Sequence, residues 1–174
     1  MPKPFILCYS KRDFDKLCQS HGWTGEENFP QNTVFISITN HEACQDYLGE
    51  KFKESDFHLF PDSEHVLNVE FDDIAKDTMT TKDGTIIRGM DDETADKIVA
   101  FIDKYAGHDI IVHCKAGKSR SQAVVTYVLD NYPELYTKSR INRMNPPVFY
   151  MVNQHAKQKL REAYERLNLS RTSG

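Results

Sequence analysis

Residues 113–121 read His-Cys-Lys-Ala-Gly-Lys-Ser-Arg-Ser, and they join the apolar run at 110–112 to a helical pattern at 121–129. A strand that turns into a helix through so short a loop directs backbone N–H groups toward the centre of the loop. The helix presents the positive end of its dipole to the same point. This stretch therefore predicts a strand, a phosphate-binding loop and a helix in succession.

The loop carries a thiol at one end, Cys114, and a guanidinium at the other, Arg120. Helix N-termini and nearby cations favour the thiolate form of cysteine, and a guanidinium can hold two phosphate oxygens at once. A nucleotide-binding loop of the form G-x-x-x-x-G-K-[ST] is excluded, because its first glycine would fall on Val112. A buried structural cysteine is the alternative interpretation of Cys114.

Cys114, Arg120 and Ser121 match the pattern Cys-x5-Arg-Ser/Thr. At these residues the chain resembles the cysteine-dependent protein tyrosine phosphatase superfamily, and most closely its compact dual-specificity phosphatase branch. A weaker resemblance extends over residues 66–154. The resemblance implies a two-step reaction in which Cys114 attacks phosphorus to form a phosphocysteine, which water then hydrolyses.

The resemblance also implies roles for the other residues of the loop. Arg120 and the loop amides would neutralise the equatorial phosphate oxygens, since phosphoryl transfer depends mainly on positioning and charge. His113 would support the loop, and Ser121 would donate its hydroxyl to the thiolate. Their alternatives are a packed strand-end histidine and an ordinary serine of a first helical turn. The residues expected to bind the phosphate are Lys115, Ala116, Gly117, Lys118, Ser119 and Arg120.

The leaving group needs a proton, so an acidic side chain should face the loop. The resembling enzymes carry this acid as an aspartate after the preceding strand, and here the apolar strand pattern at 66–71 runs into Asp72 and Asp73. Asp73 falls on the acid position, Asp72 is the adjacent alternative, and Asp83 is a third candidate at the usual sequence distance. An inserted loop at 75–90 explains why Asp73 is unusually far from Cys114. A solvated turn or a helix cap is the alternative role for each aspartate.

Hydrophobic periodicity predicts the other elements. Apolar runs indicate strands at 5–9, 33–39, 66–71 and 110–112, and helical spacing indicates helices at 14–21, 42–52, 91–105, 121–129 and 148–167. Strands that alternate with helices predict an α/β domain, with a mostly parallel sheet of four to five strands flanked by helices. We expect one phosphatase domain over 1–169 and a flexible tail at 170–174.

The segment before the last helix contains Arg140, Arg143 and the pair Asn145-Pro146. It resembles the Arg-rich, Asn-Pro-containing approach to the last helix of dual-specificity phosphatases, which supports the phosphate loop from behind. Asparagine followed by proline is also a sound helix start, and ordinary capping explains the segment nearly as well. No catalytic residue is assigned to it.

Composition and charge narrow the class of protein. The chain has 174 residues, 39% of them hydrophobic and 28% charged, which is typical of one globular domain without a membrane span or signal peptide. A net charge of -4 disfavours nucleic-acid binding and stable membrane association. If Cys114 is a free thiolate, three other cysteines remain, and an odd number cannot all pair in disulfides within the chain. This favours a location in the reducing cytoplasm. We expect a monomer that needs no cofactor or metal.

Three interpretations of the activity and its substrate remain. The compact branch lacks the long insertions that deepen the site of tyrosine-specific enzymes, so we expect a shallow site. Such a site would accept phosphotyrosine in proteins or peptides, together with phosphoserine and phosphothreonine. Lys115 and Lys118 resemble the paired lysines of phosphoinositide 3-phosphatases, which makes a phosphoinositide or inositol phosphate the alternative substrate. Solvent-facing charge is the alternative role for both lysines. A phosphate-binding module without turnover is the third reading.

Overall fold

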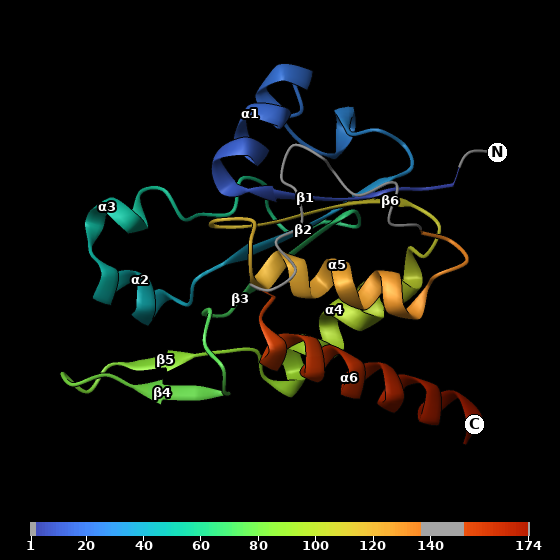
Figure 1. Cartoon of the computed structure of the whole chain (residues 1–174). Coiled ribbons are helices and arrows are strands. Elements are labelled where there is room, and N and C mark those ends of the chain that lie inside the picture. Colours follow the sequence, from blue (N-terminus) through green and yellow to red (C-terminus); the bar gives the residue numbers. More distant parts are fainter. Residues whose placement is uncertain (1–2, 137–151, 174) are drawn as a thin grey trace.

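The computed structural model describes residues 3–136 and 152–173 and confirms an α/β architecture (Figure 1). Four parallel strands form the central sheet in the order β1-β6-β2-β3. These strands are β1 (Ile6–Ser10), β2 (Thr33–Thr39), β3 (Val66–Glu70) and β6 (Asp109–Cys114). The helices of the described ranges are α1 (Lys11–His21), α2 (Glu42–Leu48), α3 (Glu50–Lys53), α4 (Asp92–Lys104), α5 (Arg120–Asn131) and α6 (Gln154–Thr172), with a short 3-10 turn at Glu26–Asn28.

Strand β6 lies inside the sheet, between β1 and β2. Its apolar residues are buried because helices cover both faces of a parallel sheet. Parallel strands end at the same edge, so Cys114 at the end of β6 is in register with Ser10 of β1, and His113 with Ser37 of β2. Ligands bind at this carboxyl edge in open α/β sheets. The sheet therefore places Cys114 at the middle of the edge where a site is expected.

Two layers of helices enclose the sheet. Helix α1 covers one face, α4 and α5 cover the other, and α6 packs against α4 and α5 (Figure 1). Side chains alternate along the strands, so Phe35 packs toward Phe14 of α1, whereas Ile36 belongs to the larger core under α4 to α6. Of the helices in the described ranges, none combines the length and the apolar character needed to cross a bilayer.

Three elements differ from the sequence predictions. The helix predicted at 42–52 is divided into α2 and α3 by Gly49, which has a φ of 96°. The predicted loop at 75–90 contains an antiparallel hairpin of β4 (Thr78–Thr80) and β5 (Ile86–Arg88). The last helix begins at Gln154, not at 148, and it continues through Thr172, so that part of the expected tail is helical. The Arg140 to Asn145 segment lies outside the described residues.

Helix α6 begins late because its cap is Asn153. The Asn153 side chain accepts a hydrogen bond from the Ala156 N–H at 3.0 Å, which satisfies one of the free donors of the first turn. Residue 152, immediately before the cap, is not helical. Asn153 is thus the N-cap, a role that the sequence had suggested for Asn145.

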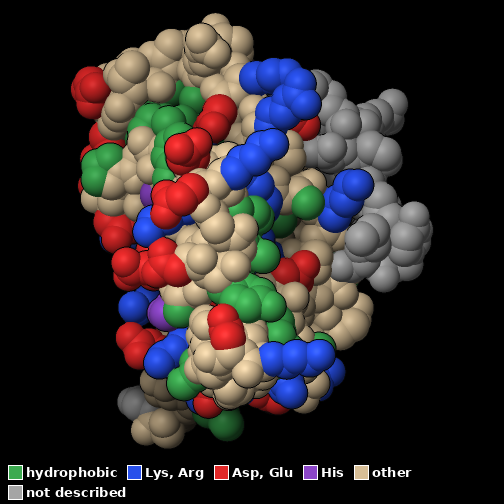
Figure 2. All heavy atoms as spheres, turned by 90° about the vertical axis from the view of Figure 1, so that its left-hand side faces the viewer, with side chains coloured by type: hydrophobic (Ala, Val, Ile, Leu, Met, Phe, Trp, Pro, Cys, Tyr) green, Lys and Arg blue, Asp and Glu red, His purple; other side chains and the backbone are tan. Residues whose placement is uncertain are grey.

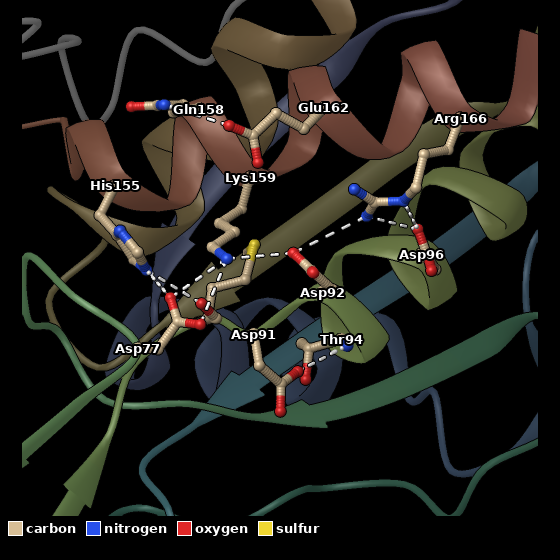
Figure 3. A network of polar contacts seen from close by, with 11 residues as sticks. Asp77, Asp91, Asp92, Thr94, Asp96, His155, Gln158, Lys159, Glu162 and Arg166 are labelled. Atoms are coloured by element: carbon tan, nitrogen blue, oxygen red, sulfur yellow. Dashed lines mark hydrogen bonds and ion pairs between the residues drawn. The ribbon is translucent and has the colours of Figure 1, made fainter.

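Charged side chains fasten the hairpin to α6 (Figure 3). Asp77 Oδ1 lies 2.9 Å from His155 Nε2 and 3.2 Å from Lys159 Nζ. Lys159 also lies 3.0 Å from Asp92 Oδ1 in the first turn of α4, and its hydrogen bond to Asp92 raises the pKa of the lysine. One side of α6 therefore holds both the base of the hairpin and the start of α4.

Candidate active site

The loop after β6 surrounds the sulfur of Cys114 with hydrogen-bond donors. The backbone N–H of Gly117 lies 3.2 Å from Cys114 Sγ, and Ser121 Oγ lies 3.1 Å from it. Both Cys114 and Ser121 are buried. An N–H group and a hydroxyl that converge on one sulfur suit a sulfur that carries negative charge.

A second cysteine contacts the Ser121 hydroxyl. Cys8 Sγ of β1 donates to Ser121 Oγ at 3.0 Å, and the carbonyl oxygen of Gly117 is a second acceptor at 3.5 Å. Burial, followed by the nearby Cys114, raises the pKa of Cys8 to about 12, so Cys8 stays a protonated donor at neutral pH. A hydroxyl that accepts from Cys8 has its own proton free for Cys114. Sequence patterns could not reveal this pair, because the two residues are 113 positions apart and meet only where α5 packs on β1.

Gly117 lets the loop pass close to the end of β1. It has a φ of 69°, in the left-handed region that favours glycine. A Cβ atom at this position would lie 2.6 Å from the backbone nitrogen of Ser10 and 2.8 Å from the carbonyl carbon of Tyr9. Only glycine therefore fits both the backbone conformation and the space.

Arg120 is the first residue of α5 and is buried, with an exposed fraction of 4%. Its Nη1 donates to the carbonyl oxygen of Phe71 at 2.8 Å. Phe71 comes immediately before Asp72 and Asp73, so this bond ties the end of the phosphate loop to the segment with the candidate acids. Within residues 3–136 and 152–173 this is the one hydrogen bond of the guanidinium, so its other donors can face an anion.

The structure separates the three candidate acids. Asp73 is exposed, and its Oδ1 accepts from Ser119 Oγ and from Asn153 Nδ2, both at 2.7 Å. Asp72 is buried, and its two oxygens accept from the backbone N–H groups of His41 and Arg88, each at 2.8 Å. Among the described residues, the loop at 115–119 thus contacts Asp73. Asp72 instead links the backbone at His41 to the backbone at Arg88.

Asp83 lies in the turn of the β4–β5 hairpin. It accepts from the Thr81 hydroxyl and, at 3.2 Å, from the Thr85 N–H. The Thr81 bond, then the Thr85 bond, lowers the pKa of Asp83, as expected for a carboxylate that caps a turn. These contacts give Asp83 a local structural role.

His113 is buried beneath the loop. Its ring stacks on Phe14 with a centroid distance of 4.4 Å, and its Nε2 lies 2.7 Å from Ser37 Oγ. Ser37 Oγ is also 2.7 Å from His58 Nδ1. Burial, and then the charge of Lys11, lowers the pKa of His113 to about 3, so this histidine is neutral over the physiological range. Its packing supports the strand end that carries Cys114.

The two lysines of the loop have different environments. Lys115 Nζ donates to the carbonyl oxygen of Ser55 at 3.1 Å and to the Ser55 hydroxyl, and it lies 4.8 Å from the centroid of the Phe52 ring. Lys118 is exposed, and within residues 3–136 and 152–173 it makes no ion pair or side-chain hydrogen bond. Lys115 therefore joins the loop to the end of α3, whereas Lys118 is free to meet a ligand.

The other residues of the loop either line it or contact the candidate acid Asp73. Ala116 is exposed and Gly117 donates its N–H to the sulfur. The hydroxyl of Ser119 donates to Asp73, and phosphate binding by this residue stays a prediction. Asn153, which also contacts Asp73, was not found from the sequence; the one available signal was an asparagine ahead of a helical pattern.

Comparison with known proteins gives structural likenesses only. No protein-family model matches the chain, and no curated protein matches it. A crystal structure of PTPMT1 is similar with a TM-score of 0.43 and 18% identity, over 98% of this chain and 94% of that one. A crystal structure of PTPMT1 in complex with PI(5)P is similar with a TM-score of 0.41 and 16% identity, over 95% and 94%. The chemistry of the site therefore follows from its own residues.

Proposed function

We propose that the protein is a cysteine-dependent phosphatase that hydrolyses phosphotyrosine in proteins, with phosphoserine and phosphothreonine as further substrates. One observation carries this proposal: the sulfur of Cys114 receives the Gly117 N–H at 3.2 Å and faces the Ser121 hydroxyl at 3.1 Å, beside the N-terminus of α5. A sulfur held in this way is prepared to act as a nucleophile toward an anionic phosphate that the loop amides and Arg120 bind.

In the first step, the sulfur of Cys114 attacks phosphorus and the bond to the leaving oxygen breaks. Arg120 and the loop N–H groups neutralise the equatorial oxygens, and Asp73 gives its proton to the leaving oxygen. In the second step, Asp73 takes a proton from water as the water oxygen attacks phosphorus. The S–P bond breaks, and the Ser121 hydroxyl stabilises the departing sulfur.

The face that carries α2, α3 and the hairpin supports a protein substrate. Figure 2 shows the face that carries α2, α3 and the hairpin, with acidic, basic and apolar side chains interspersed. Tyr47 and Leu48 of α2 and Ile86 of β5 are exposed large hydrophobic residues, with exposed fractions of 51%, 48% and 47%. Such a mixed surface suits a polypeptide around the phosphorylated residue better than it suits an anionic lipid layer.

A phosphoinositide or inositol phosphate is the second candidate substrate, and Lys118 is the observation that favours it. This lysine is exposed in the phosphate loop and could meet a second phosphate group. Lys115 does not strengthen this candidate, because Ser55 and Phe52 already hold its ammonium group. We also propose a cytoplasmic location, which the four free cysteines support.

Hydrolysis of p-nitrophenyl phosphate by the purified chain tests the reaction. Cys114→Ser is expected to abolish turnover while circular dichroism stays unchanged, because the hydroxyl is a much weaker nucleophile than the thiolate. Cys18→Ser, which alters a buried cysteine of α1 remote from the loop, is the matched control and should retain turnover. Full turnover in Cys114→Ser would refute the mechanism.

A substrate panel tests the substrate class. Phosphotyrosine, phosphoserine and phosphothreonine peptides are compared with soluble phosphoinositides, for the natural chain and for Lys118→Ala. We expect the largest kcat/KM on phosphotyrosine and little effect of the lysine substitution on peptides. Dominant phosphoinositide hydrolysis that Lys118→Ala weakens would replace our first substrate with the second.

A further inference from the structure

Two donors from distant parts of the chain converge on one oxygen of Asp73. Ser119 Oγ, in the phosphate loop, and Asn153 Nδ2, at the start of α6, both lie 2.7 Å from Asp73 Oδ1. These residues are 46 and 80 positions away from Asp73 in the sequence. The contacts join the candidate acid, the loop of the nucleophile and the last helix at one atom.

The structure fixes the orientation of the Asn153 amide. Its oxygen accepts the Ala156 N–H of the first turn of α6 at 3.0 Å, so its nitrogen must point the other way. That nitrogen donates to Asp73 Oδ1 and, at 3.2 Å, to the carbonyl oxygen of Ile74. The backbone N–H of Asn153 donates to the carbonyl oxygen of Ser119 at 3.2 Å. Helix capping and acid contact therefore require the same amide orientation.

The Ser119 hydroxyl also donates its hydrogen bond to Asp73. Ser119 occupies the N-cap position of α5, where a serine side chain usually accepts an N–H of the first turn, but it makes no such bond. Its hydroxyl donates to Asp73 Oδ1 instead. With two donors on Oδ1, both lone-pair directions of that oxygen are occupied.

We propose that Asn153 is a positioning residue for the general acid, and that the transferred proton resides on Asp73 Oδ2. The inference rests on the proposed phosphatase function. The Oδ2–H bond breaks as the leaving oxygen gains the proton and the electron pair of its bond to phosphorus. In the second step a proton from water returns to Oδ2. Asn153 and Ser119 keep Oδ1 as the acceptor in both steps, so that Oδ2 faces the reacting atoms.

The test compares two substrates that differ in their need for an acid. Phenyl phosphate has a poor leaving group and depends on protonation, whereas p-nitrophenyl phosphate has a good one. Asn153→Ser retains a side chain that can cap α6 but removes the amide donor. We expect its kcat/KM on phenyl phosphate to fall about tenfold further than on p-nitrophenyl phosphate, a part of the 100-fold or more that an acid contributes.

Controls separate positioning from folding. Asp91→Ala removes the N-cap of α4, where Asp91 Oδ1 accepts the Thr94 N–H at 2.8 Å, and should lower stability without changing the ratio of the two substrates. Ser119→Ala, the second variant, should change the ratio in the same direction as Asn153→Ser. An equal loss on both substrates in Asn153→Ser would overturn the inference and leave Asn153 a structural cap.

The outcome also distinguishes this inference from the proposed function. Asp73→Asn should give the largest change in the ratio, because it removes the proton altogether. If Cys114→Ser abolishes turnover and Asp73→Asn leaves the ratio of the two substrates unchanged, the proposed phosphatase function is kept and the positioning role of Asn153 is rejected. If Cys114→Ser retains turnover, the proposed phosphatase function is rejected, and the role of Asn153 that rests on it is rejected as well.

Discussion

Lowering the pH from 7 to 5 is expected to destabilise the folded protein through one buried residue, His113. Its ring is 1% exposed, stacked on Phe14 and hydrogen-bonded to Ser37, and burial followed by the Lys11 charge lowers its pKa from 6.5 to about 3. Between these two values the unfolded chain binds a proton that the folded chain does not. The stabilisation is therefore complete above pH 6.5 and is lost as the pH falls toward 3.

The size of the effect follows from the shift. A difference of one pKa unit corresponds to about 1.4 kcal/mol, so the complete loss below pH 3 is about 5 kcal/mol. Between pH 7 and pH 5 the folded state should lose about 2 kcal/mol through His113 alone. This loss is a sizeable fraction of the 5–15 kcal/mol that typically stabilises a domain.

Urea denaturation at pH 7 and at pH 5 measures this loss. His113→Gln keeps an amide that can pair with Ser37 and removes the titrating ring, so the variant should lose about 2 kcal/mol less than the natural chain over this interval. His21→Gln, at an exposed position of α1, is the matched control and should behave like the natural chain. An equal pH dependence in His113→Gln and the natural chain would refute the reasoning.

Three further substitutions have expected outcomes. Cys8→Ala removes the donor to Ser121. In the proposed mechanism kcat includes hydrolysis of the phosphocysteine, so kcat should fall several-fold with little change in kcat/KM, and an equal fall of both would contradict this role. Gly117→Ala places a Cβ 2.6 Å from a backbone nitrogen at a φ of 69°, so the free energy of unfolding should fall by more than about 1 kcal/mol in urea titrations, and an unchanged value would be the contrary result. Asp77→Asn weakens the ion pair with Lys159, and since Asp77 is half exposed the cost should be about 0.5 kcal/mol and should shrink in high salt.

Local patterns predicted the parts of the fold that depend on local chemistry. The strand at 33–39 has the predicted bounds, and the helix predicted at 91–105 is α4, Asp92–Lys104. The loop at 115–119 follows the buried end of β6, as the apolar run at 110–112 predicts. These features need only the periodicity of neighbouring residues and the chemistry of a cap or a turn.

The unpredicted features depend on residues that are far apart in the sequence. The segment at 75–90 is rich in Thr, Asp, Lys and Gly, so its sequence predicts a loop. The structure has a hairpin there, and β4 is exposed along its whole length, so it lacks the alternation of a half-buried strand. The partnership of Cys8 with Ser121 joins residues 113 positions apart, and that of Asn153 with Asp73 joins residues 80 apart. Side-chain contacts of this kind follow from the assembled fold, which periodicity does not describe.

The base of the β4–β5 hairpin is closed by hydrogen bonds, so the position of Asp73 does not depend on the length of the hairpin. Asp72 N donates to Arg88 O at 2.6 Å and Arg88 N donates to Asp72 Oδ2 at 2.8 Å, so the two ends of the insertion meet next to Asp73. Asp77 holds the same base to α6. Residues gained or lost at the tip of the hairpin would therefore leave Asp73 in place.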